Sequence, residues 1–408
     1  MSSQRSRYMV LAIDERLRQV FGAQVRCDGP LAASGAGLRV SGIDLGTPLR
    51  PDEVGALLDA LAQYRIVTLT GQQLDSFSVA HFERFANHWG APLPHPSNFK
   101  RGSLERFMDN PELLLPEERP SAQVNAAFPG ELHCLPGADS PAVLVVANMH
   151  KLSDEERETG PTLTRGTTWH TDIEHHPIPL HVSMFLVHKV PVTRDAPGNT
   201  WVRDPESDNA SNAPYFENAD PDLMRLRRAL PRNGETSFAD TAAAYAALPQ
   251  AERARLSRIQ VRRHSYARKQ TVPVPLVRAN PRSGIKSLHS PLWCPRPPRQ
   301  VPVEVVGMSG AASRAFLDDI EAHVLQPEFR YDHAHAPGDV TIWDLFMTIH
   351  VAPPIKENIQ SIDDARLLYR ISCKGEPALK LPRCDSPAWI EKHIFMGYTT
   401  PREAIEAC

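Results

Sequence analysis

A histidine and an aspartate separated by one residue are the first groups in this chain that could do chemistry. They are His170 and Asp172, in a segment that begins with a tryptophan. In a β-strand, residues two apart face the same side, so an imidazole and a carboxylate at this spacing can reach one metal ion. A second pair, His81 and Glu83, falls in an expected helix, where residues two apart point in different directions. The first pair therefore predicts a metal site, and the second a structural role.

A third metal ligand follows an expected strand much further along the chain. A turn at Gly338-Asp339 leads into this strand, which runs through Asp344, and His350 lies just beyond it. Two histidines and one carboxylate make up the facial triad of non-haem Fe(II) oxygenases, which leaves three metal positions open. The same three residues around zinc would suit a hydrolase. A non-catalytic binding protein could also retain them without turnover. It is equally consistent with the sequence that His350 is a buried core histidine.

Two arginines lie four residues apart on another expected strand. On a strand, Arg366, Leu368 and Arg370 share one face, with the two arginines about 13 Å apart. Arginines on the inner face of an apolar strand would each need an anion, and a guanidinium can form a bidentate pair with a carboxylate. The pattern therefore predicts carboxylate ligands, unless this face of the strand is exposed to solvent.

Taken together, these motifs resemble the taurine dioxygenase/TfdA family of Fe(II)- and 2-oxoglutarate-dependent dioxygenases. The resemblance covers roughly residues 50–375 and rests on these ordered motifs: Trp169 to Asp172, Gly234 to Asp240 followed by Ala242 to Tyr245, Gly338 to Asp344, His350, Arg366 and Arg370. It implies a mainly β fold with flanking helices around a double-stranded β-helix (jelly-roll) core. It also implies oxidation, by default hydroxylation, of an unactivated C–H bond in a small organic substrate, with succinate and CO2 as coproducts.

The resemblance assigns roles to individual residues and implies Fe(II), 2-oxoglutarate and O2 as reaction partners. The iron ligands would be three residues: His170, Asp172 and His350. Arg366 would bind the distal carboxylate of 2-oxoglutarate, and the hydroxyl of Thr236 would assist. Thr200 is an alternative for that threonine, but the alanine-rich helix expected after Thr236 fits the family better.

Two further residues are similar to positions that bind substrate in taurine dioxygenase. His95 precedes a proline and corresponds to a pocket position, although a loop histidine explains it equally well. Arg370 is similar to the arginine that holds the acidic group of the substrate. The resemblance therefore implies a small-molecule substrate with an acidic group.

The helices and strands that would position these residues follow from periodicity. Apolar residues at helical spacing after a proline predict a helix over residues 51–64, and a second helix is expected over 76–89. Alternating or continuous apolar runs predict strands over these ranges: 38–40, 65–69, 142–147, 181–190, 340–346 and 366–372. The 38 prolines favour a loop-rich, β-containing fold over long helices.

The expected organisation has three parts: an N-terminal segment (1–50), a dioxygenase domain (51–375) and a C-terminal extension (376–408). Residues 191–233 are polar and turn-rich, which predicts an inserted loop or lid. This insertion, the C-terminal extension and the long interval between His350 and Arg366 depart from the family pattern. These departures affect the expected substrate more than the expected iron ligands.

Composition excludes several other classes of protein. The 408 residues include 45 basic and 48 acidic ones, for a net charge of −3, which provides no field to hold nucleic acid or an anionic membrane. Six cysteines are scattered without a CxxC pair, and no signal peptide is apparent. We therefore expect a cytoplasmic protein with reduced thiols. The sequence leaves a homo-oligomer open.

One strongly basic stretch has no role in the dioxygenase interpretation. It contains Arg253, Arg255, Arg258, Arg262, Arg263, Arg268 and Lys269. Charged runs of this kind are usually solvated surfaces, and a nucleic-acid site is the less favoured alternative. The sequence therefore predicts that these side chains face solvent.

Overall fold

The computed structural model describes the following residues: 12–93, 95, 98, 116–172, 174, 180–205, 212–263, 273–295, 297 and 302–374. The expected C-terminal extension, 376–408, lies outside the described residues. No helix in the described part of the chain is long and apolar enough to cross a membrane.

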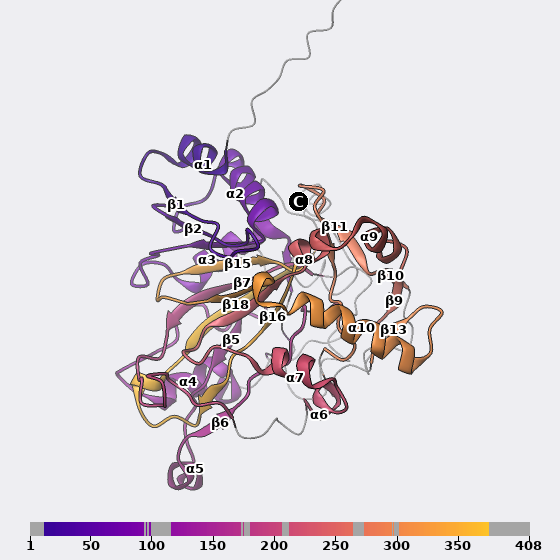
Figure 1. Ribbon diagram of the computed structural model, residues 1–408. Coiled ribbons are helices and arrows are strands. Elements are labelled where there is room, and N and C mark those ends of the chain that lie inside the picture. The colour runs from indigo at the N-terminus through magenta and orange to yellow at the C-terminus, as the bar shows by residue number, and fades with distance from the viewer. Residues whose placement is uncertain are drawn as a thin grey trace, which may run out of the picture.

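Two β-sheets form the centre of the molecule (Figure 1). The strands of the larger sheet are β1 (Arg26–Asp28), β2 (Leu38–Ser41), β3 (Ile66–Leu69), β4 (Ala91–Pro92), β5 (Leu144–Ala147), β7 (Leu180–Lys189), β15 (Val340–Asp344) and β18 (Leu367–Lys374). Their order is β1-β2-β3-β15-β7-β18-β4, with β5 also paired to β18. The smaller sheet has the order β14-β8-β16 and is built from β8 (Thr236–Asp240), β14 (Arg330–His333) and β16 (Thr348–Val351). Only β2 and β3 pair in parallel among the strand pairs described in these two sheets.

Helices and short hairpins surround these sheets, so the molecule is a mixed α/β structure. The helices are α1 (Ile13–Phe21), α2 (Pro51–Tyr64), α3 (Val79–Ala86), α4 (Pro120–Ala127), α5 (Asp154–Thr159), α6 (Ala213–Phe216), α7 (Pro221–Arg228), α8 (Thr241–Ala247), α9 (Gln250–Leu256) and α10 (Gly310–Val324). The remaining strands pair as β6 (Thr162–Thr164) with β17 (Ile355–Glu357), β11 (Val277–Ala279) with β12 (Lys286–Leu288), and β9 (Gln260–Arg262) with both β10 (Val274–Pro275) and β13 (Glu304–Val305). In Figure 1, α1 and α2 lie at the top and α7, α9 and α10 to the right of the strands.

Alternation of side chains along the strands separates the hydrophobic core into layers. Leu367, Tyr369 and Ile371 of β18 pack with the apolar residues of α2 and α3. Leu368 instead lies in a smaller cluster with Phe238 of the second sheet. Because residues two apart share a face, the even-numbered positions of β18 point into the space between the two sheets. The two arginines predicted to face inward, at either side of Leu368, therefore do so.

Most of the expected elements are confirmed to within one or two residues. The helix predicted over residues 51–64 is α2, and the three long predicted strands are β7, β15 and β18. The second predicted helix begins later than expected, at Val79, because Ser78 accepts a hydrogen bond from the His81 backbone and caps it. Its last residues form a separate turn of 3-10 helix, Asn87–Trp89.

The predicted turn before β15 is also confirmed and has a clear physical basis. Gly338 has a φ of +83°, a conformation that glycine adopts without the steric cost of a Cβ atom. Its backbone nitrogen donates to Val187 of β7, and its carbonyl accepts from Gln72. The turn therefore fixes the start of β15 against its neighbour in the sheet.

The segment 191–233 differs from the loop that its polarity predicts, because its described part contains α6 and α7. Arg227 on α7 is buried and pairs with Glu321 of α10 at 2.6 Å and with Asp318 at 2.9 Å. Tyr215 of α6 donates its hydroxyl to Glu321. Arg227 thus attaches this segment to α10, which lies about 90 residues further along the chain. The local sequence gives no sign of such a distant contact. Its role as a lid stays a prediction.

Arg227→Met is expected to lower the free energy of unfolding by about 3–5 kcal/mol, because it leaves the fully buried Glu321 carboxylate without its cation. Urea denaturation of the purified protein would measure this change. Arg225→Met, on the same helix, is the matched control, since Arg225 and its partner Asp222 are both mostly exposed. Equal, small changes in both variants would contradict a stabilising role for the buried pair.

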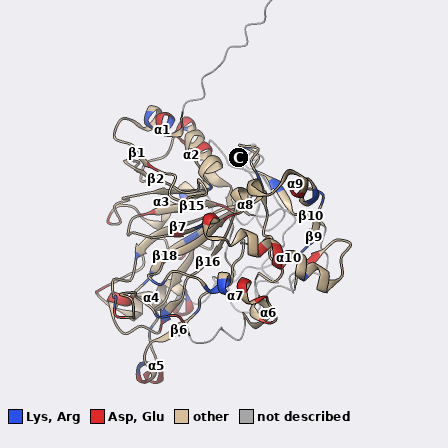
Figure 2. Cartoon of the chain, in the orientation of Figure 1, with Lys and Arg blue, Asp and Glu red and all other residues tan. Residues whose placement is uncertain are grey.

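Charged residues of both signs are mixed over the outer helices, as the net charge leads one to expect. Figure 2 shows acidic and basic residues side by side on α1 and α9. In the predicted solvated basic stretch, Arg255 and Arg258 are exposed. The prediction is wrong for Arg263, which is only 2% exposed because it lies just beyond β9, where the chain enters the interior.

Candidate metal centre

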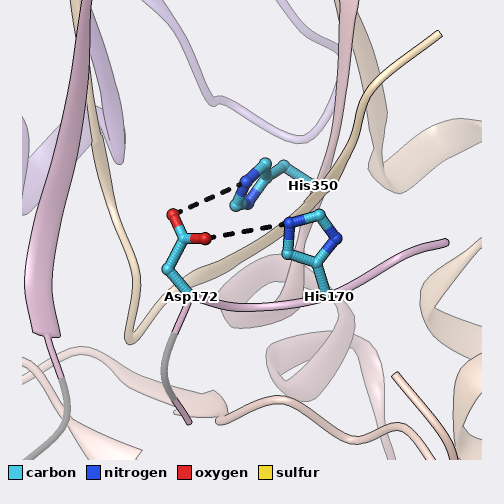
Figure 3. Close-up of side chains that lie close together, drawn as sticks. All are labelled: His170, Asp172 and His350. Carbon is cyan, nitrogen blue, oxygen red and sulfur yellow. Dashed lines mark ion pairs between the residues drawn. The ribbon is translucent and has the colours of Figure 1, made fainter. Parts of the chain in front are cut away.

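Three side chains meet between the two sheets (Figure 3). His350 lies on β16, and His170 pairs with it through an isolated antiparallel bridge, in which both N–O distances are 2.9 Å. Asp172 follows two residues later, so its carboxylate points to the same side. One ligand atom from each residue lies within 4.8 Å of those of the other two, and all three residues are at least 96% buried.

The imidazole of His170 is oriented for metal binding. Its Nδ1 lies 2.6 Å from the carbonyl oxygen of Thr168. A carbonyl can only accept, so Nδ1 carries the proton and Nε2 keeps its lone pair. Metal-bound histidines usually have such a partner on the other ring nitrogen, because it fixes the tautomer and the ring orientation.

The distances within the triad fit a shared first-row metal ion. Nε2 of His170 lies 3.8 Å from one carboxylate oxygen of Asp172, and Nε2 of His350 lies 3.8 Å from the other. Ligands at about 2.1 Å from one ion are about 3–4 Å apart, depending on the angle between them. A donor set of two imidazoles and one carboxylate suits a ferrous ion with open positions.

Hydroxyl groups and an arginine orient the Asp172 carboxylate. Ser183 of β7 donates its hydroxyl to Oδ2 at 2.9 Å, and Oγ of Ser372 lies 2.7 Å from Oγ of Ser183. Nη2 of Arg370 lies 3.4 Å from Oδ1. These groups lie on adjacent strands of the large sheet, where Ser183 and Ser372 are direct register partners. Neither serine could be identified from the sequence, since serines on strands are too common to indicate a role.

Ser183→Ala is expected to weaken Fe(II) binding by about 10-fold, because the carboxylate loses the hydrogen bond that orients it. Titration of the metal-free protein with Fe(II) under anaerobic conditions would measure the change in affinity. Ser313→Ala is a suitable control, since Ser313 is equally buried but bonds to the backbone of Val305. A similar affinity in both variants would show that Ser183 does not support the site.

Arg366 is a buried cation directly before β18, the strand that carries Arg370. It is 5% exposed, and its Nε donates to the carbonyl of Gly234 at 3.1 Å. Burial lowers the pKa of this guanidinium to about 10, although the charge of Glu235 acts in the opposite direction. No carboxylate in the described part of the chain forms an ion pair with it. A buried guanidinium in this state is a natural binding site for an external anion.

Thr236 begins β8, two residues after the glycine that Arg366 contacts. Its hydroxyl oxygen lies 2.9 Å from Nε2 of His335, and the residue is 2% exposed. The hydroxyl of Thr200, the alternative, instead donates to carbonyl oxygens in its own turn. Arg366 thus contacts the backbone of the segment that leads into Thr236, and the choice of Thr236 over Thr200 stays a prediction.

His335 is a neighbour of this site that the sequence analysis missed. Desolvation and the nearby positive charge of Arg366 hold its pKa well below the ordinary value, so it is neutral at physiological pH. A neutral imidazole can exchange one hydrogen bond with the Thr236 hydroxyl. No local pattern signals this contact, because the two residues are 99 positions apart in the sequence.

His95 lies in the segment that follows β4. Its backbone nitrogen donates to the carbonyl of Pro141, and Leu93, two residues earlier, donates to the carbonyl of Ser372. The segment therefore runs beside the end of β18 that carries Ser372.

The two sheets hold a buried metal-binding triad between them, and comparison with known proteins identifies the family to which such a site belongs. The family "Taurine catabolism dioxygenase TauD, TfdA family" matches residues 28–204 and 216–371. The chain belongs to this family. The match includes all three residues of the triad as well as Thr236, Arg366 and Arg370.

Two curated relatives are similar over part of the chain. The (S)-phenoxypropionate/alpha-ketoglutarate-dioxygenase of Sphingobium herbicidovorans is 30% identical over 168 residues, which are 36% of this chain and 54% of that protein. Pentalenolactone F synthase of Streptomyces arenae is 32% identical over 137 residues, or 29% of this chain and 46% of that protein. The chain spans about half the length of the curated relatives it matches.

Solved structures show the same fold. A taurine dioxygenase from Burkholderia xenovorans has a TM-score of 0.51 and 21% identity, over 86% of this chain and 92% of that one. AAD-2, solved with Mn(II) and N-oxalylglycine, has a TM-score of 0.53 and 20% identity, over 87% of this chain and 99% of that one. The large, mostly antiparallel sheet is therefore an arrangement that this chain shares with these proteins.

Proposed function

We propose that the protein is an Fe(II)- and 2-oxoglutarate-dependent dioxygenase that oxidises an unactivated C–H bond of a small organic molecule. Hydroxylation is the simplest outcome, in which substrate, O2 and 2-oxoglutarate give hydroxylated product, succinate and CO2. The observation that carries the proposal is the buried triad of two histidines and an aspartate beside Arg366, a buried cation without a carboxylate partner. Membership of the family supports this assignment.

In this proposal His170, Asp172 and His350 hold the ferrous ion. When bound, the ion and 2-oxoglutarate together supply the activation of oxygen. The protein's own contribution is to orient the ligands through Thr168 and Ser183, and to exclude water by burying the triad. A triad that is at least 96% buried favours reaction at the substrate over side reactions with solvent.

Arg366 and Thr236 would hold the distal carboxylate of 2-oxoglutarate. The guanidinium offers a bidentate pair to the carboxylate, and the threonine hydroxyl donates a third hydrogen bond. Because the single hydroxyl proton of Thr236 is then donated to the carboxylate, Nε2 of His335 would donate to the threonine oxygen, which makes His335 a positioning residue for Thr236. Binding of the anion would give the buried guanidinium the partner that the protein itself does not provide.

The arrangement of the two sheets supports a double-stranded β-helix core. One sheet contributes β7 and β18, whose inward side chains contact Asp172, and the other contributes His350 on β16. The small hydrophobic cluster with Phe185, Phe238 and Trp343 fills the space between them. A metal between two facing sheets is what the jelly-roll prediction requires.

The substrate is proposed to be a small molecule with an acidic group. One relative is described as a dioxygenase of (S)-phenoxypropionate, which carries a carboxylate. Arg370 and His95 stay predictions as substrate-binding residues. Arg370 already lies 3.4 Å from Asp172, so part of its charge is compensated by the metal-binding carboxylate.

Oxygen-dependent formation of succinate tests the proposed activity. Purified protein with Fe(II), ascorbate and 2-oxoglutarate is expected to consume O2 and release succinate slowly even without the substrate, and His350→Ala should not. Tyr245→Phe would be a fold control, since its hydroxyl bonds to the Arg253 backbone. Succinate formation that is absent from well-folded, iron-loaded protein would overturn the proposal and favour a zinc hydrolase, which needs neither O2 nor 2-oxoglutarate.

A further inference from the structure

Another buried arginine, just beyond β9, has no ion-pair partner among the described residues. Arg263 is 2% exposed, and its Nη2 donates to the backbone carbonyls of His289 and Ser290 at 2.6 and 3.1 Å. Its Nε and Nη1 are buried, and neither has a hydrogen-bond partner among the residues that the structure describes. Burial lowers the pKa of this guanidinium to about 10, so it stays charged at physiological pH. Two buried donors of a charged group are therefore left unused.

Arg278 adds a second guanidinium to the same place. It lies on β11, opposite Ser287 of β12, and His289 follows two residues after Ser287. Paired residues and residues two apart share a face of a hairpin, so Arg278 and His289 point to the same side. Both lie against Phe346. The distance to the centroid of the Phe346 ring is 5.8 Å from Cζ of Arg278 and 5.7 Å from the ring centroid of His289.

Arg278 and His289 also have unused polar atoms. Nε of Arg278 is buried without a hydrogen-bond partner, while the residue as a whole is partly exposed. His289 is fully buried, and neither of its ring nitrogens has a partner. Burial and the charges of Arg263 and Arg278 hold its pKa well below the ordinary value, so the ring is neutral. It can donate one hydrogen bond to an anion.

Several contacts connect this group to the metal centre. Phe346 lies between β15 and β16, four residues before His350, and its carbonyl accepts the hydroxyl of Ser287. The charge of Glu174, two residues after Asp172, acts on Arg263. Thr168 donates its hydroxyl to the carbonyl of Pro295, which joins the segment of the triad to the segment that Arg263 contacts.

The local charges do not balance. Within the described residues, Glu174 is the carboxylate whose charge acts on Arg263, and no carboxylate forms an ion pair with either Arg263 or Arg278. Two guanidinium groups that have no ion-pair partner among the described residues leave positive charge uncompensated in a largely desolvated place. Such an excess is costly unless an anion from outside the protein completes the group.

We propose that Arg263, Arg278 and His289 bind a carboxylate of the substrate, and that Phe346 contacts its apolar part. This assignment rests on the proposed dioxygenase function, and it places the acidic group away from Arg370, which already pairs with Asp172. It is also separate from the 2-oxoglutarate site at Arg366. A fork of guanidinium donors selects planar carboxylates over neutral groups of the same shape.

Binding of simple carboxylates to the metal-free protein tests this proposal independently of turnover. The probes are benzoate, phenylacetate and 3-phenylpropionate, each compared with its neutral amide by titration calorimetry. At least one carboxylate should bind at least 10-fold more tightly than its amide. Arg263→Met and Arg278→Met should each remove this preference, whereas Arg262→Met should not, since Arg262 is the neighbouring residue and pairs with Glu304. Arg366→Met should also retain it, because the carboxylate site is not the 2-oxoglutarate site.

Three results would overturn the proposal: equal binding of acids and amides, no binding of any of the three acids, or loss of the preference in Arg370→Met but not in Arg263→Met. If Arg263→Met does not fold, Arg278→Met gives the same test on a partly exposed side chain. Because no iron or 2-oxoglutarate is present, a failure here is distinct from a failure of the dioxygenase activity, which the release of succinate reports.

Discussion

Asp172→Ala is expected to lower the affinity for Fe(II) by about 100-fold or more and to eliminate oxygen-dependent succinate formation. Outer-shell changes alone cost metal sites about 10–100-fold, and this change removes a ligand. Asp172 is the one carboxylate of the triad, so two neutral imidazoles would remain without an anionic donor. The change also leaves Arg370 without the carboxylate that lies 3.4 Å from it, which adds positive charge next to the metal position.

Anaerobic titration with Fe(II) would measure this loss, and thermal unfolding of the metal-free protein would show that the variant is folded. Asp332→Ala is the matched control, because Asp332 is an exposed aspartate on β14, at the edge of the smaller sheet, that accepts a hydrogen bond from Ser237. Its Fe(II) affinity should equal that of the unmodified protein. An Asp172→Ala variant that keeps its affinity to within threefold would remove Asp172 from the list of ligands.

Arg366→Met is expected to raise the KM for 2-oxoglutarate by roughly 30- to 1,000-fold. Truncating one partner of a buried charge pair costs about 2–4 kcal/mol, which corresponds to that range. Fe(II) affinity should change little, since Arg366 has no described contact with the triad. The metal-free protein should not lose stability, because methionine removes a buried cation that has no carboxylate partner.

The dependence of succinate formation on 2-oxoglutarate concentration would measure this effect. Arg330→Met is the matched control: Arg330 is also largely buried, but its donors bond to the carbonyls of Leu226 and Ala229. Its KM for 2-oxoglutarate should be that of the unmodified protein. An unchanged KM in Arg366→Met would assign the distal carboxylate to other residues.

The large sheet and the metal triad could be predicted from the sequence because their signals are local. β7, β15 and β18 are apolar runs bounded by turn residues, and the alternation on β18 places both arginines on the face of Leu368. His170 and Asp172 are two residues apart, so the backbone alone brings them together. His350 joins them through its backbone bridge to His170. Its role as the third ligand was predicted from the order of motifs in the family.

The groups that surround the triad could not be predicted, since they depend on contacts between distant segments. Ser372 reaches Ser183, the hydrogen-bond donor to Asp172, only because β7 and β18 are adjacent. His335 lies two residues past β14 and meets Thr236 at the start of β8. Arg263 was expected at the surface because its neighbours in sequence are charged. Its burial follows from the two backbone carbonyls that it binds, about 26 residues further along the chain.

The measurement that tests the central claim most directly is anaerobic addition of Fe(II) and then 2-oxoglutarate to the metal-free protein, followed by visible absorption. A charge-transfer band should appear only when both are present, and it should be absent in His170→Ala. The same band should need much more 2-oxoglutarate in Arg366→Met. Folded protein that binds Fe(II) but shows no band with 2-oxoglutarate would contradict the assignment of the site.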